Sequence, residues 1–129
     1  MNNWTTVAAV IVAGLATAAG PAAAQSGEAS KGQRVFNTQC RSCHTLEKDG
    51  AQVTGPNLHG LFGRKAGTSP GYAYSDAMKN SGIVWDETTL AEYNRDPKGK
   101  VPGTKMIYNG VKNAGQLADL VAYLKEATK

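Results

Sequence analysis

Two cysteines and a histidine stand together in the first third of the chain, in the order Cys40-Arg41-Ser42-Cys43-His44. Two thiols separated by two residues can add to the two vinyl groups on one edge of a porphyrin. The imidazole of the next residue, His44, can then bind the iron beneath the ring. This spacing is the attachment signature of a c-type haem. It predicts one haem c, bonded covalently to Cys40 and Cys43 and ligated by His44.

The same residues allow three other interpretations. A Cys-x-x-Cys pair can be a redox-active dithiol, although no βαβ pattern surrounds it here. The pair can form a structural disulfide, which an exported protein favours. Cys43 and His44 could also join His59 in a zinc site, although two adjacent ligands fit tetrahedral zinc poorly.

The second axial position of the iron decides what such a protein can do. If a protein ligand fills it, the iron passes electrons but does not readily bind a substrate, whereas an open position suits a peroxidase or a gas-binding protein. Met106 is the predicted ligand, because it lies in a flexible, mostly polar segment, residues 101–106, between two predicted helices. Met78 lies in a polar turn and is predicted to be a haem contact instead.

The N-terminus has the pattern of a secretory signal peptide. Residues 1–27 carry no charged side chain, and residues 7–19 form an apolar run that is shorter than the about 20 residues that span a bilayer. Small residues at 22–24 supply a cleavage site. We therefore predict a cleaved signal peptide at 1–24, a mature domain at 25–129 and a periplasmic location. Because no Lys or Arg precedes the apolar run, an uncleaved membrane anchor is the alternative.

Three segments are predicted to be helices: about 28–40, about 86–96, and a third that begins at Asn113 with a possible capping box. Pro97 is expected to stop the second helix. A short extra turn is expected between residues 75 and 82, and no strand is predicted, because no segment alternates with period two. The apolar face of the third helix consists of Leu117, Leu120, Val121 and Leu124.

Long Gly- and Pro-rich stretches separate the predicted helices, especially residues 49–71 and 98–110. Loops of this length are unusual in a compact domain of about 105 residues. They make sense if they wrap a group that is not protein. The predicted fold is therefore all-α, a small single domain of three main helices with long loops around one haem.

Three strings in the chain resemble the class I cytochromes c, of mitochondrial and bacterial periplasmic type. The resemblance covers residues 28–129 and implies the cytochrome c fold and a soluble one-electron carrier that is not an enzyme. It also implies that the first and third predicted helices cross at Gly32. The strings are Cys40-Arg41-Ser42-Cys43-His44-Thr45, Thr54-Gly55-Pro56-Asn57-Leu58-His59-Gly60-Leu61-Phe62-Gly63-Arg64 and Pro102-Gly103-Thr104-Lys105-Met106.

The resemblance implies roles for further residues around the haem. The carbonyl of Pro56 would accept a hydrogen bond from the ring of His44 and so orient the ligand. Arg64, Tyr74 and Trp85 would surround the haem propionates, with a charge from Arg64 and O–H and N–H donors from the two aromatic rings.

Other positions concern the far side of the haem. The resemblance places Tyr93 near the Met106 sulfur. The chain also departs from the family there: Asn94 stands where relatives usually have an aliphatic residue against the haem, and Met78 stands where many have Asn. These changes could retune the reduction potential, and Tyr93 and Asn94 are both predicted to contact the cofactor.

The charge distribution bears on partners. The net charge of +4 lies entirely at or beyond residue 28, which suggests an acidic protein partner, since nucleic acid is a poor fit for an exported chain. The resemblance implies membrane redox complexes of respiration or photosynthesis: a cytochrome bc complex as donor, and cytochrome c oxidase, a peroxidase or a photosynthetic reaction centre as acceptor. A monomer is expected. The predicted docking residues, which could alternatively serve only solubility, are Arg34, Lys98, Lys105 and Lys112.

Overall fold

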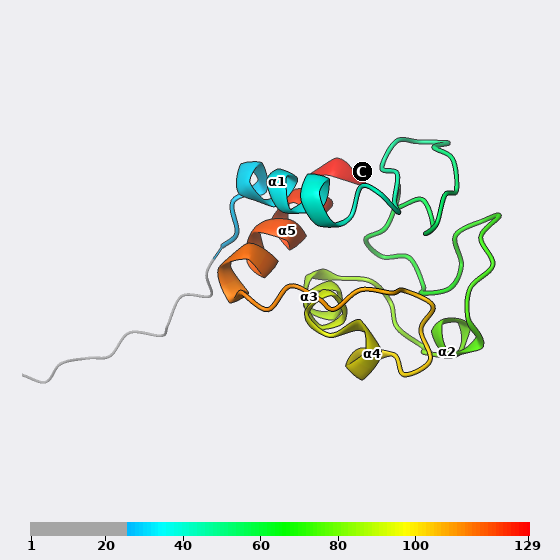
Figure 1. Ribbon diagram of the computed structural model, residues 1–129. Coiled ribbons are helices and arrows are strands. Elements are labelled where there is room, and N and C mark those ends of the chain that lie inside the picture. Colours follow the sequence, from blue (N-terminus) through cyan, green and yellow to red (C-terminus); the bar gives the residue numbers. More distant parts are fainter. Residues whose placement is uncertain (1–25) are drawn as a thin grey trace, which may run out of the picture.

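The computed structural model describes residues 26–129, which form five helices and no strand (Figure 1). The predicted all-α fold is confirmed. The predicted signal peptide at 1–24 lies outside the described residues. The helices are α1 (Ala29–Gln39), α2 (Asp76–Lys79), α3 (Glu87–Arg95), α4 (Pro97–Lys100) and α5 (Ala114–Ala127).

The predicted apolar face of α5 packs where α1 crosses it. Leu117, Leu120, Val121 and Leu124 are all buried, as their spacing predicted. At the crossing, Gly32 of α1 lies so near α5 that a Cβ on it would be 1.9 Å from the Asp119 carbonyl oxygen. The ring of Phe36 packs on that of Tyr123, with 5.7 Å between the ring centroids.

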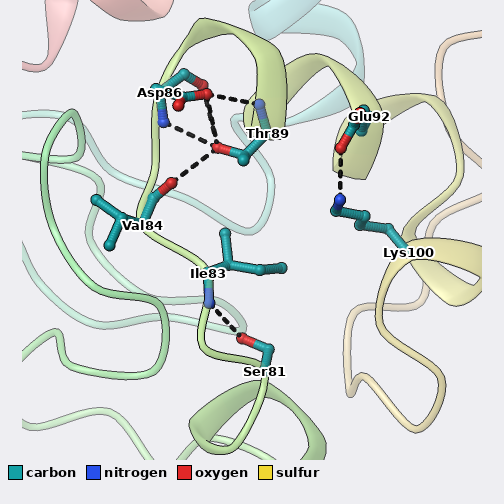
Figure 2. A network of polar contacts seen from close by, with 7 residues as sticks. All are labelled: Ser81, Ile83, Val84, Asp86, Thr89, Glu92 and Lys100. Atoms are coloured by element: carbon teal, nitrogen blue, oxygen red, sulfur yellow. Dashed lines mark hydrogen bonds and ion pairs between the residues drawn. The ribbon is translucent and has the colours of Figure 1, made fainter.

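A reciprocal capping box begins α3 (Figure 2). The Asp86 carboxylate accepts a hydrogen bond from the Thr89 backbone N–H at 2.7 Å, and the Thr89 hydroxyl accepts one from the Asp86 N–H at 2.9 Å. The start of α5 has only half of this motif: the Asn113 side chain accepts from the Gln116 N–H at 2.9 Å.

The prediction that residues 98–110 form one loop was wrong in its first part, because α4 begins at Pro97. Proline ends α3 there, but its fixed φ and missing N–H also suit the first position of a new helix. The Asp96 side chain caps this helix by accepting a hydrogen bond from the Gly99 N–H at 3.1 Å. An ion pair between Lys100 and Glu92 ties α4 to α3 (Figure 2).

Two apolar clusters make up the interior. One surrounds Trp85 and Tyr93, and the other surrounds Phe36 and Leu120. Leu58, Phe62 and Ala91 pack against both clusters. Among residues 26–129, no helix combines the length and the apolar character needed to cross a bilayer.

We expect Gly32→Ala to destabilise the protein, because the new methyl group would collide with the backbone of α5. Overpacking of this kind costs about 1–3 kcal/mol, to be measured as the free energy of unfolding in guanidinium chloride. Gly115→Ala in the first turn of α5 is the control, since its Cβ would meet only the Asn113 side-chain oxygen, at 3.2 Å. Equal stabilities of the two variants would contradict the close crossing.

Candidate cofactor site

A cavity lies between the two apolar clusters and is lined by residues from both. Phe36, Cys40 and Leu124 come from one cluster, and Trp85 and Leu90 come from the other. The helices therefore do not fill the interior with their own side chains along this boundary. The predicted cofactor residues that line this cavity are Cys40, Cys43, His44, Pro56, Arg64, Tyr74, Trp85, Tyr93, Asn94 and Met106.

The Cys-x-x-Cys-His segment forms a tight turn directly after α1. The Cys40 N–H donates to the Phe36 carbonyl at 2.8 Å, and the N–H groups of Cys43 and His44 both donate to the Cys40 carbonyl at 3.0 Å. This turn brings both thiols and the imidazole to one side of the cavity. Burial raises the pKa of the Cys40 thiol to about 11, which keeps it protonated at neutral pH.

The His44 ring is held in one orientation. Its Nδ1 lies 2.8 Å from the Pro56 carbonyl oxygen, and because a carbonyl can only accept, Nδ1 must carry the proton. The other nitrogen, Nε2, is then free to donate a lone pair to a metal. Burial lowers the pKa of His44, although the bond to Pro56 opposes this, so the neutral form that binds metals is favoured.

Gly55 completes the support behind this ring. Its N–H donates to the Cys43 carbonyl at 2.7 Å, and a Cβ at this position would lie 2.5 Å from His44 Cε1. Only glycine allows the loop to pass so close to the imidazole. Gly55 thus packs against the ring, and the Pro56 carbonyl accepts a hydrogen bond from it.

Arg64 provides the test of whether the cavity suits a haem. Its Nη1 donates to the His59 carbonyl at 2.8 Å and its Nη2 to the Asn57 carbonyl at 3.3 Å. Its buried Nε, however, has no partner within residues 26–129. A half-buried guanidinium that lines an apolar cavity suits a carboxylate. The haem propionates supply such groups, so the lining fits the predicted cofactor.

The segment that carries Met106 is fixed by side chains from distant parts of the chain. The hydroxyl groups of Tyr93 and Thr104 are 2.7 Å apart. Lys105 donates to the Ala73 carbonyl and lies 5.1 Å from the centroid of the Tyr72 ring. These contacts hold the half-buried Met106 at the cavity. Met78 lines the same cavity and is buried.

The predicted docking residues are spread over several elements. Arg34 lies on α1 and Lys98 on α4, two helices that Figure 1 shows well apart. Lys112 precedes α5 and donates to the Arg95 carbonyl at 2.7 Å. All four residues are exposed, but only Lys105 lines the cavity.

The competing metal and disulfide interpretations find no support. No group of three or more His, Cys, Asp or Glu residues is gathered for a metal anywhere in 26–129. His59 does not line the cavity. Cys40 and Cys43 form no disulfide with one another within residues 26–129.

Sequence reasoning missed two residues that support the site. Thr104 is the partner of the Tyr93 hydroxyl. Asn57 is buried, and its side-chain amide donates to the Thr45 hydroxyl at 2.8 Å and to the Glu47 carbonyl at 3.0 Å. A short polar residue next to Gly-Pro was the available signal for Asn57, whereas nothing in the sequence points to Thr104.

Comparisons with known proteins find a family model and relatives that match most of this chain. The family model for cytochrome c matches residues 29–128. The chain is 50% identical to a cytochrome c from Sesamum indicum over 105 residues, which cover 81% of this chain and 95% of that protein. It is 52% identical to a cytochrome c from Gibberella zeae over 80% of this chain and 97% of that protein. It is 53% identical to a cytochrome c2 from Blastochloris viridis over 87% of this chain and 86% of that protein.

Proposed function

Because the chain belongs to the cytochrome c family, and is thus an electron carrier with one covalently attached haem c, we propose that it shuttles single electrons between membrane-bound redox complexes. The observation that carries this proposal is that Cys40, Cys43, His44 and Met106 line one cavity. His44 and Met106 are the proposed axial ligands of the iron. The haem supplies one iron that cycles between the ferrous and ferric states.

The protein's part in this chemistry is to hold the two ligands still. Pro56 and Gly55 fix the ring of His44 from behind, and the pair of Tyr93 and Thr104 fixes the segment of Met106. Ligands that do not move between the two oxidation states keep the reorganisation small. If His44 and Met106 both bound the iron, substrates would be kept from it, as expected of a carrier rather than an enzyme.

The polar lining has a separate role. The half-buried Arg64 offers a positive charge for the propionates, and Tyr74 and Trp85 line the same cavity. The Tyr74 hydroxyl accepts a hydrogen bond from the Ser69 N–H at 3.2 Å, so its ring is fixed. We assign these three residues to propionate binding. A thioether ligand and an apolar pocket both favour ferrous iron, because the extra ferric charge is poorly solvated there.

Export and docking complete the proposal. Residues 1–24 have the pattern of a cleaved signal peptide, which supports a soluble monomer in the periplasm, serving a respiratory or photosynthetic chain. The donor would be a cytochrome bc complex, and the acceptor cytochrome c oxidase, a peroxidase or a photosynthetic reaction centre. The exposed Arg34, Lys98, Lys105 and Lys112 would steer the protein onto acidic surfaces of these complexes.

Expression of the full chain in a bacterium with haem-attachment machinery tests the export proposal. The periplasmic fraction should contain a chain that starts at Gln25, with the added mass of one haem. Intact mass spectrometry of that fraction gives both values. A haem-loaded protein that retains residues 1–24 in the membrane fraction would contradict cleavage, and an unmodified mass would contradict attachment.

Substitution of the proposed sixth ligand tests the axial pair. Met106→Ala should abolish the sulfur-to-iron charge-transfer band and allow the ferrous protein to bind carbon monoxide rapidly, because the sixth position opens. Met78→Leu is the matched control and should keep the band, since it changes a buried methionine of the same cavity. If only the Met78 variant lost the band, Met78 would be the sixth ligand and Met106 the haem contact. Rapid carbon monoxide binding by the unaltered protein would contradict the carrier function.

Electron transfer to a purified cytochrome c oxidase tests docking by charge. The bimolecular rate constant should fall steeply as ionic strength rises, because salt screens attraction between exposed charges. Replacing both Lys98 and Lys112 by Gln should slow the reaction roughly 2–10-fold at low salt. Lys125→Gln is the control, since Lys125 is already paired with Glu87. A rate that does not depend on salt would refute steering.

A further inference from the structure

One buried amide faces the cavity. Within the described part of the chain, the buried polar residues are Asn57, Ser69, Asn94 and Thr128. Of these, only Asn94 lines the cavity, and it is 7% exposed. Its neighbours there from the same cluster, Trp85 and Leu90, are mainly apolar. A polar side chain at this position therefore calls for an explanation.

The orientation of this amide is fixed by its hydrogen bond. Asn94 Nδ2 donates to the Leu90 carbonyl, one turn back along α3, at 2.9 Å. Because a carbonyl only accepts, the NH₂ end of the amide must point along the helix. The Asn94 backbone carbonyl accepts from the Val111 N–H at 2.8 Å, so the residue is held at its main chain as well.

The opposite end of the amide is its oxygen, Oδ1. Among residues 26–129, no hydrogen-bond donor reaches this atom, yet it is not enclosed by protein in the way that Arg64 Nε is. Since the residue is buried and lines the cavity, the remaining accessible space beside Oδ1 is the cavity itself. The negative end of the amide dipole thus faces the space that holds the haem.

A fixed partial negative charge favours the oxidation state with the greater positive charge, and it acts strongly where the dielectric constant is low. We infer that Asn94 tunes the haem, and that its amide oxygen lowers the reduction potential by stabilising ferric iron. The Tyr93 hydroxyl, which lines the same cavity, is paired with the Thr104 hydroxyl. The inference deepens the proposed carrier function but rests on haem attachment, not on which methionine is the ligand.

Redox titration of the purified holoprotein tests the inference. Asn94→Leu removes the dipole while keeping a side chain of similar size, so the midpoint potential should rise. Asn94→Met is the second variant, because the flexible methionine side chain adapts to the available space. It allows the same measurement if the leucine variant does not fold. Melting temperatures of the same samples show whether Asn94 also stabilises the fold.

The matched control is Leu124→Ile, which alters the lining of the same cavity without adding or removing a polar group. It should shift the midpoint less than either Asn94 variant does. An unchanged or lowered midpoint in Asn94→Leu or Asn94→Met would overturn the inference, even if the melting temperature falls. Failure of the carrier function would be seen separately, as carbon monoxide binding by the unaltered ferrous protein.

Discussion

The structure depends on an apolar interior that protein side chains alone do not complete. The described helices are short, and their buried residues form two clusters with a cavity at the boundary. A chain of this size buries a marginal amount of surface by itself. A haem bonded to Cys40 and Cys43 would add apolar surface at this boundary, between the two clusters.

The two sides of the cavity are held by different means. On the His44 side, the contacts involve the backbone: the turn after α1, the Pro56 carbonyl and the close approach of Gly55. On the Met106 side, the contact between Tyr93 and Thr104 joins two side chains. A local covalent clamp keeps the haem in place, whereas the distal side depends on tertiary packing. The distal side is thus where sequence changes can adjust the site without detaching the cofactor.

Sequence patterns predicted the elements whose signals are local. The buried stripe of α5, the Asp86 cap of α3 and the chemistry of Cys40, Cys43 and His44 all follow from short spacings. Helix α4 was missed because Pro97 can end one helix or begin another, and only the Asp96 cap decides. Without the family resemblance, Trp85 and Tyr93 would have passed as ordinary core residues. The role of Thr104 was missed, since it comes from a contact with Tyr93 on α3 that no local pattern encodes.

The Asn94 amide on α3 changes the polarity of the cavity at little cost in folding free energy. Burying an amide usually costs free energy, because its two N–H donors and its oxygen lose their hydrogen bonds to water. Asn94 offsets part of this cost within its own helix, by donating to Leu90, and the oxygen remains exposed to the cavity. The hydrogen bond from Asn94 Nδ2 to the Leu90 carbonyl also sets the direction of the amide dipole. The side chain therefore needs no further partner to orient it. A buried amide dipole acts on nearby charges more strongly than an exposed one does, because the protein interior has a lower dielectric constant than water. A single substitution at Asn94 is therefore expected to change the potential while leaving Cys40, Cys43 and the proposed ligands His44 and Met106 in place.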